Sequence, residues 1–340
     1  MSLAKIAVDI SSGDHGASVT LPAAIKFAQN TPQVELVLVG DESIISPAIP
    51  EKLKNKIKVL HAPETVLMDD PPVIALRAKK RSSMRLAVDL VRSKEADICV
   101  SAGNTGALMA MSHTRLRTIK GIDRPAIMGS FPVSKGKEIC LLDLGANVTA
   151  SSENLFQFAI LAHGLQANQL NPKPRIALLN VGHEDIKGTA VVKETAEKLH
   201  ACDALNFIGY IEGNELFSDK ADIVVCDGFV GNIMLKSCEG IVKTLYEKML
   251  TGLKNRLIFS LTFKNILKKL MKDTFQDYST DHRNGAIFVG LNGLVLKSHG
   301  NASENSFLKA LELGLTVIKD FDCQKYESLV AKITSSEVCL

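Results

Sequence analysis

Short apolar segments alternate with helical segments along most of the chain, and this alternation limits the fold more than any other feature. We expect strands over residues 4–10, 34–39, 58–61, 97–100, 126–131, 138–142, 175–180, 206–210, 223–226 and 294–297. We expect helices over residues 21–29, 83–92, 105–115, 153–164, 189–200, 230–250 and 304–318. No linker rich in Pro, Gly or Ser divides the 340 residues, so the pattern predicts a single α/β unit or two intertwined subdomains.

Polar corners that contain glycine follow six of the expected strands, at residues 11–16, 103–106, 143–147, 182–188, 227–232 and 298–303. Glycine lets the backbone approach a ligand closely, and a helix that follows offers unpaired N–H groups with partial positive charge. Any one corner is equally explained as a turn or a helix cap. Because ligands of α/β sheets bind at the carboxyl ends of strands, the six corners together predict a site for a phosphate-like anion.

Composition excludes several classes of protein. The net charge is only +3, Trp is absent, and aromatic residues make up 5% of the chain, so we expect no nucleic-acid partner. The seven cysteines form no C-x-x-C pair and are expected to be free core thiols of a reducing compartment. The first residues run directly into a strand, and no apolar run is long enough to span a membrane, so the expected location is cytoplasmic.

Familiar catalytic motifs are missing from the sequence. It has no G-x-G-x-x-G dinucleotide fingerprint, no G-x-x-x-x-G-K-[ST] phosphate loop, no H-E-x-x-H zinc pair and no G-x-S-x-G nucleophile elbow. Neither a kinase nor a serine hydrolase therefore fits.

The corners carry a specific resemblance. Two runs, SAGNTGAL at residues 101–108 and VCDGFVGN at residues 225–232, are the most specific. With GDHG at residues 13–16, KGI at 120–122, GAN at 145–147, KG at 187–188 and SHG at 298–300, in this order, the chain resembles the bacterial phosphate acyltransferases of phospholipid synthesis, the PlsX family. The resemblance covers about residues 4–320. It departs from the family pattern at Ser12 and at His183-Glu184, which add bulk beside the expected cleft.

The resemblance implies a fold and an activity. The fold would be a three-layer α/β/α sandwich with a mixed sheet, like that of isocitrate and isopropylmalate dehydrogenases, working as a homodimer. The activity would transfer an acyl group from acyl carrier protein to inorganic phosphate, without a cofactor or a metal. Phosphate is already anionic at neutral pH, so this chemistry needs no side-chain nucleophile, only groups that hold the anion and stabilise the tetrahedral oxyanion.

Candidate site residues follow from the corners. We expect Lys187 to be the charged phosphate ligand, and His15 and His299 to be further ligands or proton donors to the leaving thiolate. Asp14 and Asp227 are expected to orient neighbouring donors, because a carboxylate beside phosphate repels it. The neutral donors and backbone groups expected around the phosphate are Asn104, Thr105, Asn147, Asn232, Gly103, Gly106, Gly188 and Gly231.

Two basic clusters and one basic amphipathic segment suggest partners. Arg81, with its basic neighbours, and Arg115 with Arg117 are expected to dock the acidic carrier protein, although solvated helix faces would look the same. The segment at about 250–276 is apolar on one face and basic on another, which suits contact with an anionic membrane or packing in a dimer. Its expected membrane-contacting residues are Leu257, Phe259, Phe263, Lys264, Leu267 and Lys268. In the pathway that the resemblance implies, the product passes to a membrane glycerol-3-phosphate acyltransferase.

Three alternatives remain open from the sequence. A phosphotransacetylase-like enzyme would use an acyl group on coenzyme A. A non-catalytic module would only bind carrier protein or lipid. A metal-dependent hydroxyacid dehydrogenase would need clusters of arginines and aspartates that the corners do not supply.

Overall fold

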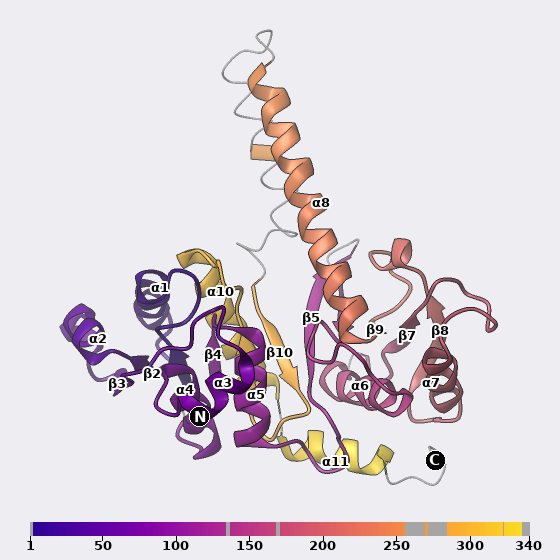
Figure 1. Ribbon diagram of the computed structural model, residues 1–340, viewed down its shortest axis with the longest axis horizontal. Coiled ribbons are helices and arrows are strands. Elements are labelled where there is room, and N and C mark those ends of the chain that lie inside the picture. The colour runs from indigo at the N-terminus through magenta and orange to yellow at the C-terminus, as the bar shows by residue number, and fades with distance from the viewer. Residues whose placement is uncertain are drawn as a thin grey trace.

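The computed structural model describes residues 3–133, 137–167, 171–255, 269–270, 284–321 and 323–334 (Figure 1). Its strands are β1 (Ala4–Asp9), β2 (Val34–Gly40), β3 (Ile57–His61), β4 (Ile98–Ser101), β5 (Ala126–Pro132), β6 (Glu138–Leu142), β7 (Arg175–Leu179), β8 (Asn206–Ile211), β9 (Ile223–Val225), β10 (Ala286–Val289) and β11 (Leu294–Lys297). Its helices are α1 (Ala17–Asn30), α2 (Glu42–Ala48), α3 (Pro72–Ala78), α4 (Ser83–Arg92), α5 (Thr105–Leu116), α6 (Ser152–Gln166), α7 (Ala190–His200), α8 (Gly228–Asn255), α10 (Glu304–Asp320) and α11 (Cys323–Thr334).

The described strands form one 11-stranded mixed sheet in the order β3-β2-β1-β4-β11-β10-β5-β6-β9-β7-β8. Strands β3, β2, β1, β4 and β11 are mutually parallel, and so are β6, β9, β7 and β8. Between these two parallel groups, β10 pairs antiparallel with β11 and with β5, and β5 pairs antiparallel with β6. Three reversals therefore separate the groups, and the second parallel group is antiparallel to the first.

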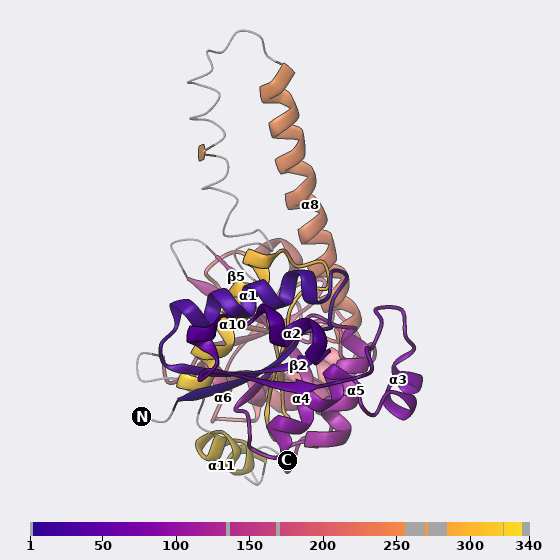
Figure 2. The ribbon, with the colours of Figure 1, turned by 90° about the vertical axis from the view of Figure 1, so that its left-hand side faces the viewer.

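Helices cover both faces of the N-terminal part of the sheet, and Figure 2 shows α1 and α10 on one face and α4 and α5 on the other. Successive residues of β1 alternate between these faces. Ile6 and Val8 belong to the core that includes Phe27 of α1 and Phe307 of α10. Ala7 belongs instead to the core that includes residues of α4 and α5. The expected three-layer sandwich is thus confirmed.

The C-terminal part of the sheet packs against α6, α7 and α11. Phe158 and Leu161 of α6 are fully buried against strands β6 and β9 in this third core. Tyr326 of α11 packs in the same core, and its hydroxyl donates to the carbonyl oxygen of Leu161 at 3.3 Å. The C-terminal helix therefore closes the face of the sheet that α6 covers.

Polar side chains cap six of the described helices at their N-termini. In each case a Ser, Thr, Asn or Asp oxygen accepts a backbone N–H that the first turn leaves unpaired. These caps are Asp41 (α2), Ser82 (α4), Asn104 (α5), Ser151 (α6), Thr189 (α7) and Ser303 (α10). These six cap residues thus fix where their helices begin, whereas α1 and α3 have no side-chain cap.

Helix α8 leaves the body of the molecule. Only its first turns lie against the sheet, and the rest extends away from it (Figures 1 and 2). Ile241, Leu245 and Met249 on the extended part are 59%, 48% and 45% exposed. They recur every four residues and form an apolar stripe on one side of the helix.

The sequence predicted the ten strands other than β10, and it missed α2, α3 and α11. Cys99, Cys140, Cys202 and Cys226 are buried and form no disulfide, as expected, whereas Cys238 of α8 is only half-buried. The six corners, which together were expected to form one anion site, do not all lie at one edge of the sheet, because β10 and β5 reverse the direction of the second parallel group. Among the described helices, none has the length and apolar character needed to cross a bilayer.

Candidate functional site

Three corners meet where the neighbouring strands β1, β4 and β11 end. Asp14 N donates to the carbonyl oxygen of Gly300 at 2.8 Å, and Ala102 N donates to Ser12 Oγ at 3.0 Å. Gly13 has φ +83° and lies so close to the third corner that an added Cβ would be 2.8 Å from Gly300 O. We call this junction, residues 11–16, 101–106 and 297–301, the corner site. Ser12 departs from the family pattern, and here it ties two corners together.

A buried carboxylate, that of Asp9, holds the corner site in place through hydrogen bonds. Asp9, the last residue of β1, is 1% exposed, and its Oδ2 accepts from Ser101 Oγ at 2.6 Å. Ser101 Oγ in turn accepts from Gly103 N at 3.1 Å, which positions the glycine corner. Burial raises the pKa of Asp9 to about 6, while the Ser101 hydroxyl opposes this rise.

Helix α8 brings charged groups to His299 of the corner site. Glu239 Oε1 lies 3.6 Å from Nε2 of His299, and Glu239 also pairs with Lys236 at 2.9 Å. Burial lowers the pKa of His299, the positive charges of Lys236 and Lys297 lower it further, and Glu239 opposes them. Burial thus favours the neutral form of the His299 imidazole at the junction of helix and corner.

A second junction joins the corners after β6 and β9. The buried Asp143 carboxylate accepts from the backbone N of Ile127, Gly145, Ala146 and Asn147 at 2.7–3.1 Å. Asn147 Nδ2 donates to Asp143 Oδ2 at 2.9 Å and to the Pro125 carbonyl oxygen at 2.8 Å. Burial raises the pKa of Asp143, and these donors oppose the rise. Asn147 is 6% exposed, and its amide is engaged in holding the loop.

The first turn of α8 sits on this second junction. Asp227 Oδ1 accepts from Val230 N at 2.8 Å, so Asp227 orients the start of the helix. Gly231 is packed so tightly that an added Cβ would overlap the Asp143 carbonyl oxygen. Asn232 is exposed, and its side chain lies beside Gly145. One helical turn, about 6 Å of rise, separates Asn232 from Lys236 beside the corner site.

Asn104 anchors a loop over the corner site. Its Oδ1 accepts from Ala107 N at 3.0 Å, and its Nδ2 donates to the carbonyl oxygens of Met68 at 2.7 Å and Asp70 at 3.1 Å. Contact of this amide with phosphate would require these bonds to be exchanged. Thr105 and Gly106, in the first turn of α5, are exposed beside the same loop.

The contacts of the corner after β7 are made within that corner and with neighbouring segments such as β8, and no hydrogen bond or ion pair among the described residues joins it to the corner site. Lys187 is 45% exposed and pairs with Glu184 of its own corner at 2.9 Å. Glu184 raises the pKa of Lys187. The side chain of Asn180 lies beside Gly188, and its Nδ2 donates to the Lys187 carbonyl oxygen at 3.4 Å. His183 is directed toward Glu215, with 2.9 Å between Nε2 and Oε2.

The structure therefore brings only part of the predicted site together. Asp14, Gly103, Asn104 and His299 lie at the corner site, with His15 exposed in the first of its corners. Asn147, Asp227, Gly231 and Asn232 lie at the second junction, and Lys187 with Gly188 lies in a third place. The sequence reasoning missed Asp9, Lys236, Glu239 and Lys297. A charged residue that ends a buried strand, as Asp9 and Lys297 do, was the available signal.

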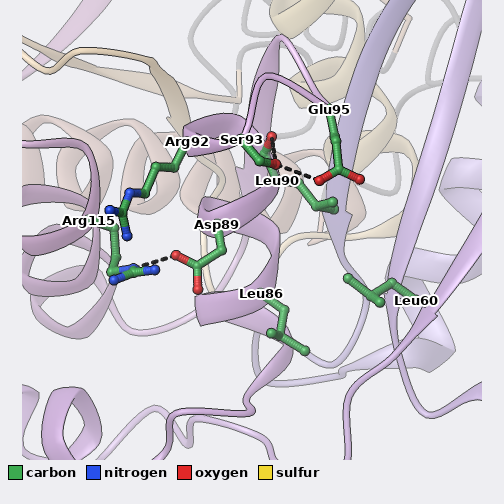
Figure 3. Close-up of a pocket in the computed structure, with 8 residues that line it drawn as sticks. All are labelled: Leu60, Leu86, Asp89, Leu90, Arg92, Ser93, Glu95 and Arg115. Carbon is green, nitrogen blue, oxygen red and sulfur yellow. Dashed lines mark hydrogen bonds and ion pairs between the residues drawn. The ribbon is translucent and has the colours of Figure 1, made fainter.

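The basic clusters differ in how far their charges are engaged. Arg115 and Arg85 both pair with Asp89, and Arg115 lines a hollow of about 390 Å³ over Leu60, Leu86 and Leu90 (Figure 3). Arg81 and Arg117 are exposed. Arg117 follows the C-terminus of α5, so the full 12-residue helix, about 18 Å, separates it from the corner site.

The expectations about membrane contact and about metal ligands can be compared only with the residues that the structure describes. The proposed membrane-contacting residues, Leu257, Phe259, Phe263, Lys264, Leu267 and Lys268, lie outside them. Within the described ranges, no group of three or more His, Cys, Asp or Glu side chains is arranged to hold a metal ion.

Known proteins resemble the chain in sequence. The family model described as "Fatty acid synthesis protein" matches residues 4–325. A phosphate acyltransferase of Shewanella sp. (strain W3-18-1) is 45% identical over 320 residues, which is 93% of each chain. A phosphate acyltransferase of Shewanella woodyi is 44% identical over 315 residues, which is 92% of each chain.

Solved structures resemble the fold. A phosphotransacetylase from Streptococcus pyogenes superimposes with a TM-score of 0.60 at 16% identity and covers 95% of this chain and 94% of its own. The EutD phosphotransacetylase from Staphylococcus aureus gives 0.59 at 16% identity and covers 94% of each chain. A 4-hydroxythreonine-4-phosphate dehydrogenase from Klebsiella pneumoniae gives 0.50 at 13% identity, covering 93% of this chain and 98% of its own. These likenesses support the expected dehydrogenase-like sandwich.

Proposed function

The chain belongs to the fatty acid synthesis protein family, and from this premise we propose that it moves a fatty acyl group from acyl carrier protein to inorganic phosphate at the corner site. The phosphate acyltransferases among its relatives support transfer of an acyl group to phosphate. The product would be an acyl phosphate for phospholipid synthesis.

The step needs no covalent enzyme intermediate. An oxygen of hydrogen phosphate attacks the thioester carbonyl carbon, and a tetrahedral oxyanion forms. The C–S bond then breaks, the thiolate takes the proton that phosphate brought, and acyl phosphate and the free thiol result. The protein's part is to hold two anionic groups together and to stabilise the oxyanion.

The observation that carries the proposal is the convergence of the corners after β1, β4 and β11. Asp14 N and Ala102 N both bond across corners, so glycine backbone, the N-terminal end of α5 and His299 share one junction. A helix N-terminus and close glycine backbone suit an anion, and a neutral imidazole can accept the proton of hydrogen phosphate and then pass it to the leaving thiolate. His299 is the proposed proton carrier, and Thr105 and Asn232 are proposed neutral donors.

The carrier-protein donor is supported by the surface beside the corner site. Loop and helix residues 67–78 cover this site, with Pro72 against Gly106 and Met68 against Gly300. Leu67, Val73 and Ile74 expose more than half of their surface there. The exposed basic residues Arg77, Lys80 and Arg81 continue the same segment. An acidic carrier that delivers an apolar chain would match both features.

Homodimer formation and membrane contact complete the proposal. The apolar stripe of α8 supports a dimer contact, because a stripe of this kind on an extended helix is otherwise left in water. The basic amphipathic segment that follows α8 in sequence is proposed to touch anionic lipid, which would place a cytoplasmic enzyme beside a membrane glycerol-3-phosphate acyltransferase. Flotation with anionic liposomes tests this contact, and protein that stays with the lipid-free fraction refutes it.

The decisive experiment mixes the chain with phosphate and either acyl-acyl carrier protein or acyl-coenzyme A. Hydroxylamine then traps any acyl phosphate as a hydroxamate. The proposal expects phosphate-dependent hydroxamate with the carrier-protein substrate. A strong preference for acyl-coenzyme A would favour the phosphotransacetylase reading, and no product with either donor would favour a binding module.

A further inference from the structure

A buried lysine lies at the corner site without a counter-ion at contact distance. Lys297, the last residue of β11, is 9% exposed. Its Nζ donates to the carbonyl oxygen of Ala102 at 3.3 Å and to that of Ser298. Among the described residues, no carboxylate oxygen lies within 4.0 Å of this Nζ. A buried ammonium that lacks a paired anion costs free energy, so its presence calls for an explanation.

The charges around Lys297 are few and none forms a close pair with it. Asp9 and Asp14 stabilise its charged form from a distance, and Lys236 of α8 opposes it. Burial is the largest effect, and it lowers the pKa of Lys297 to about 8. Asp9 is also incompletely satisfied, because its buried Oδ1 has no hydrogen-bond partner of good geometry. In the part of the chain that the structure describes, no contacting carboxylate therefore neutralises the Lys297 ammonium, which leaves this charge available to an anion.

The two carbonyl contacts use two of the three N–H donors of the ammonium. Both carbonyls belong to the corner site, one before Gly103 and one before His299. The Lys297 ammonium is thus held between the corner that starts α5 and the corner that carries the imidazole. Lys187, by comparison, is largely exposed and already paired with Glu184.

We propose that Lys297 is the cation that binds inorganic phosphate for attack on the acyl donor, with Lys236 as a second positive charge at the mouth of the site. This inference rests on the proposed function for its catalytic part. Its binding part is independent, because it concerns only an anion and this ammonium. It assigns to Lys297 the role that the sequence suggested for Lys187.

The test compares Lys297→Met with Lys187→Met, using Lys297→Arg as the charge-retaining variant. We expect Lys297→Met to lower kcat/KM for phosphate by about 10²-fold or more while KM for the acyl donor stays within about threefold. In Lys187→Met, kcat/KM for phosphate and KM for the acyl donor should both stay within about threefold of the parent values. Lys297→Arg should recover part of the activity and move the alkaline limb of the phosphate pH profile, expected near pH 8 in the parent chain, to higher pH.

Thermal melting separates a functional from a structural role. Removing an unpaired buried charge should leave the Tm of Lys297→Met unchanged or raise it, whereas a structural lysine would lower it. Inorganic phosphate should raise the Tm of the parent chain and of Lys187→Met, and should not raise that of Lys297→Met. This second measurement needs no turnover.

The outcomes are distinguishable from failure of the proposed function. If the parent chain forms acyl phosphate and Lys297→Met does so with unchanged kcat/KM for phosphate, the inference is overturned and the function stands. If the parent chain forms none, the function fails, and the phosphate-dependent melting shift alone decides whether Lys297 binds the anion. An equal phosphate shift in Lys297→Met and the parent chain overturns the inference in either case.

Discussion

Glu239 Oε1 of helix α8 lies 3.6 Å from Nε2 of His299 in the corner that follows β11. The helix starts at the second junction, where Asp227 caps it and Gly231 packs on Asp143. About three turns further along, the helix reaches the corner site at Glu239. The contact between Glu239 and His299 therefore joins two sets of corners that the antiparallel strands β10 and β5 would otherwise separate.

The first prediction concerns the charge state of His299. Glu239 raises the pKa of this imidazole against the effect of burial, so Glu239→Gln should move it further below 6.5. Because a lowered pKa makes protonation of His299 unfavourable in the folded state, Glu239→Gln should also lose more stability than the parent chain as the pH falls through that pKa. A ¹H NMR titration of the imidazole measures the shift. Glu247→Gln, two turns further along α8, is the control, and a matching shift there would contradict the contact.

The second prediction contrasts two glycines of α8. Gly231→Ala would place a methyl group against the Asp143 carbonyl oxygen and should cost about 2–3 kcal/mol of unfolding free energy. Gly240 has no neighbouring atom within 4 Å of an added Cβ, so Gly240→Ala should stabilise by about 0.5–1 kcal/mol through helix propensity. Urea denaturation measures both. Effects of the same sign would show that α8 does not begin on Asp143.

The third prediction separates the two uses of Asn104. Asn104→Ala removes the α5 cap and both bonds to the 68–70 loop, which should cost about 1–2 kcal/mol and reduce activity. Asn104→Asp keeps an oxygen for Ala107 N but places oxygen against the two loop carbonyls. It should therefore retain most of the stability while the loop becomes easier to cleave. Limited proteolysis with mass spectrometry locates the cut, and a loop as resistant as in the parent chain would rule out this tether.

The fourth prediction tests where the carrier protein docks. Reversing the charges of Lys80 and Arg81 to Glu should raise KM for acyl-acyl carrier protein by about tenfold, because these residues flank the cover of the corner site. The reversal should also weaken the salt dependence of KM. Arg117→Glu, a helix length away, is the matched control and should change KM by less than about twofold. A larger rise in KM for Arg117→Glu than for the Lys80 and Arg81 reversal would place the docking surface at the far end of α5.

The fifth prediction tests the apolar stripe of α8. Leu245→Glu puts a charge between Ile241 and Met249, so it should shift a dimer toward monomer in size-exclusion chromatography with light scattering. Lys243→Glu lies on the opposite side of the helix and should leave the mass unchanged. A monomeric parent chain, or a Leu245→Glu dimer as tight as the parent, would remove α8 from the interface.

Local patterns were enough to predict most elements, and β10 shows where they failed. No strand was expected at Ala286–Val289, although β4 and β11, which are no longer than this run, were recognised. The Asn292-Gly293 pair between β10 and β11 is a hairpin signal that could have revealed it. Without β10, the reversal of the second parallel group was invisible, and all six corners seemed to share one edge.

The site was predicted in part for the same reason. Gly103, Asp14 and His299 were found because corner residues are recognisable from local sequence. Lys297 was not, because lysines are almost always exposed and only the pairing of β11 between β4 and β10 buries this one. Asn104 was assigned to phosphate because the sequence does not reveal the loop at Met68 that its amide holds.

The placement of β11 beside β4 also means that the corner site can be completed only late in the synthesis of the chain. Residues Leu294–Lys297 leave the ribosome long after their neighbours Ile98–Ser101, so β4 waits with one open edge through most of synthesis. Chains that stop before residue 294 can build the first parallel strands yet lack both the ammonium and the imidazole. Under the roles proposed for Lys297 and His299, such truncated chains would form no acyl phosphate, and β4 would keep one unpaired edge.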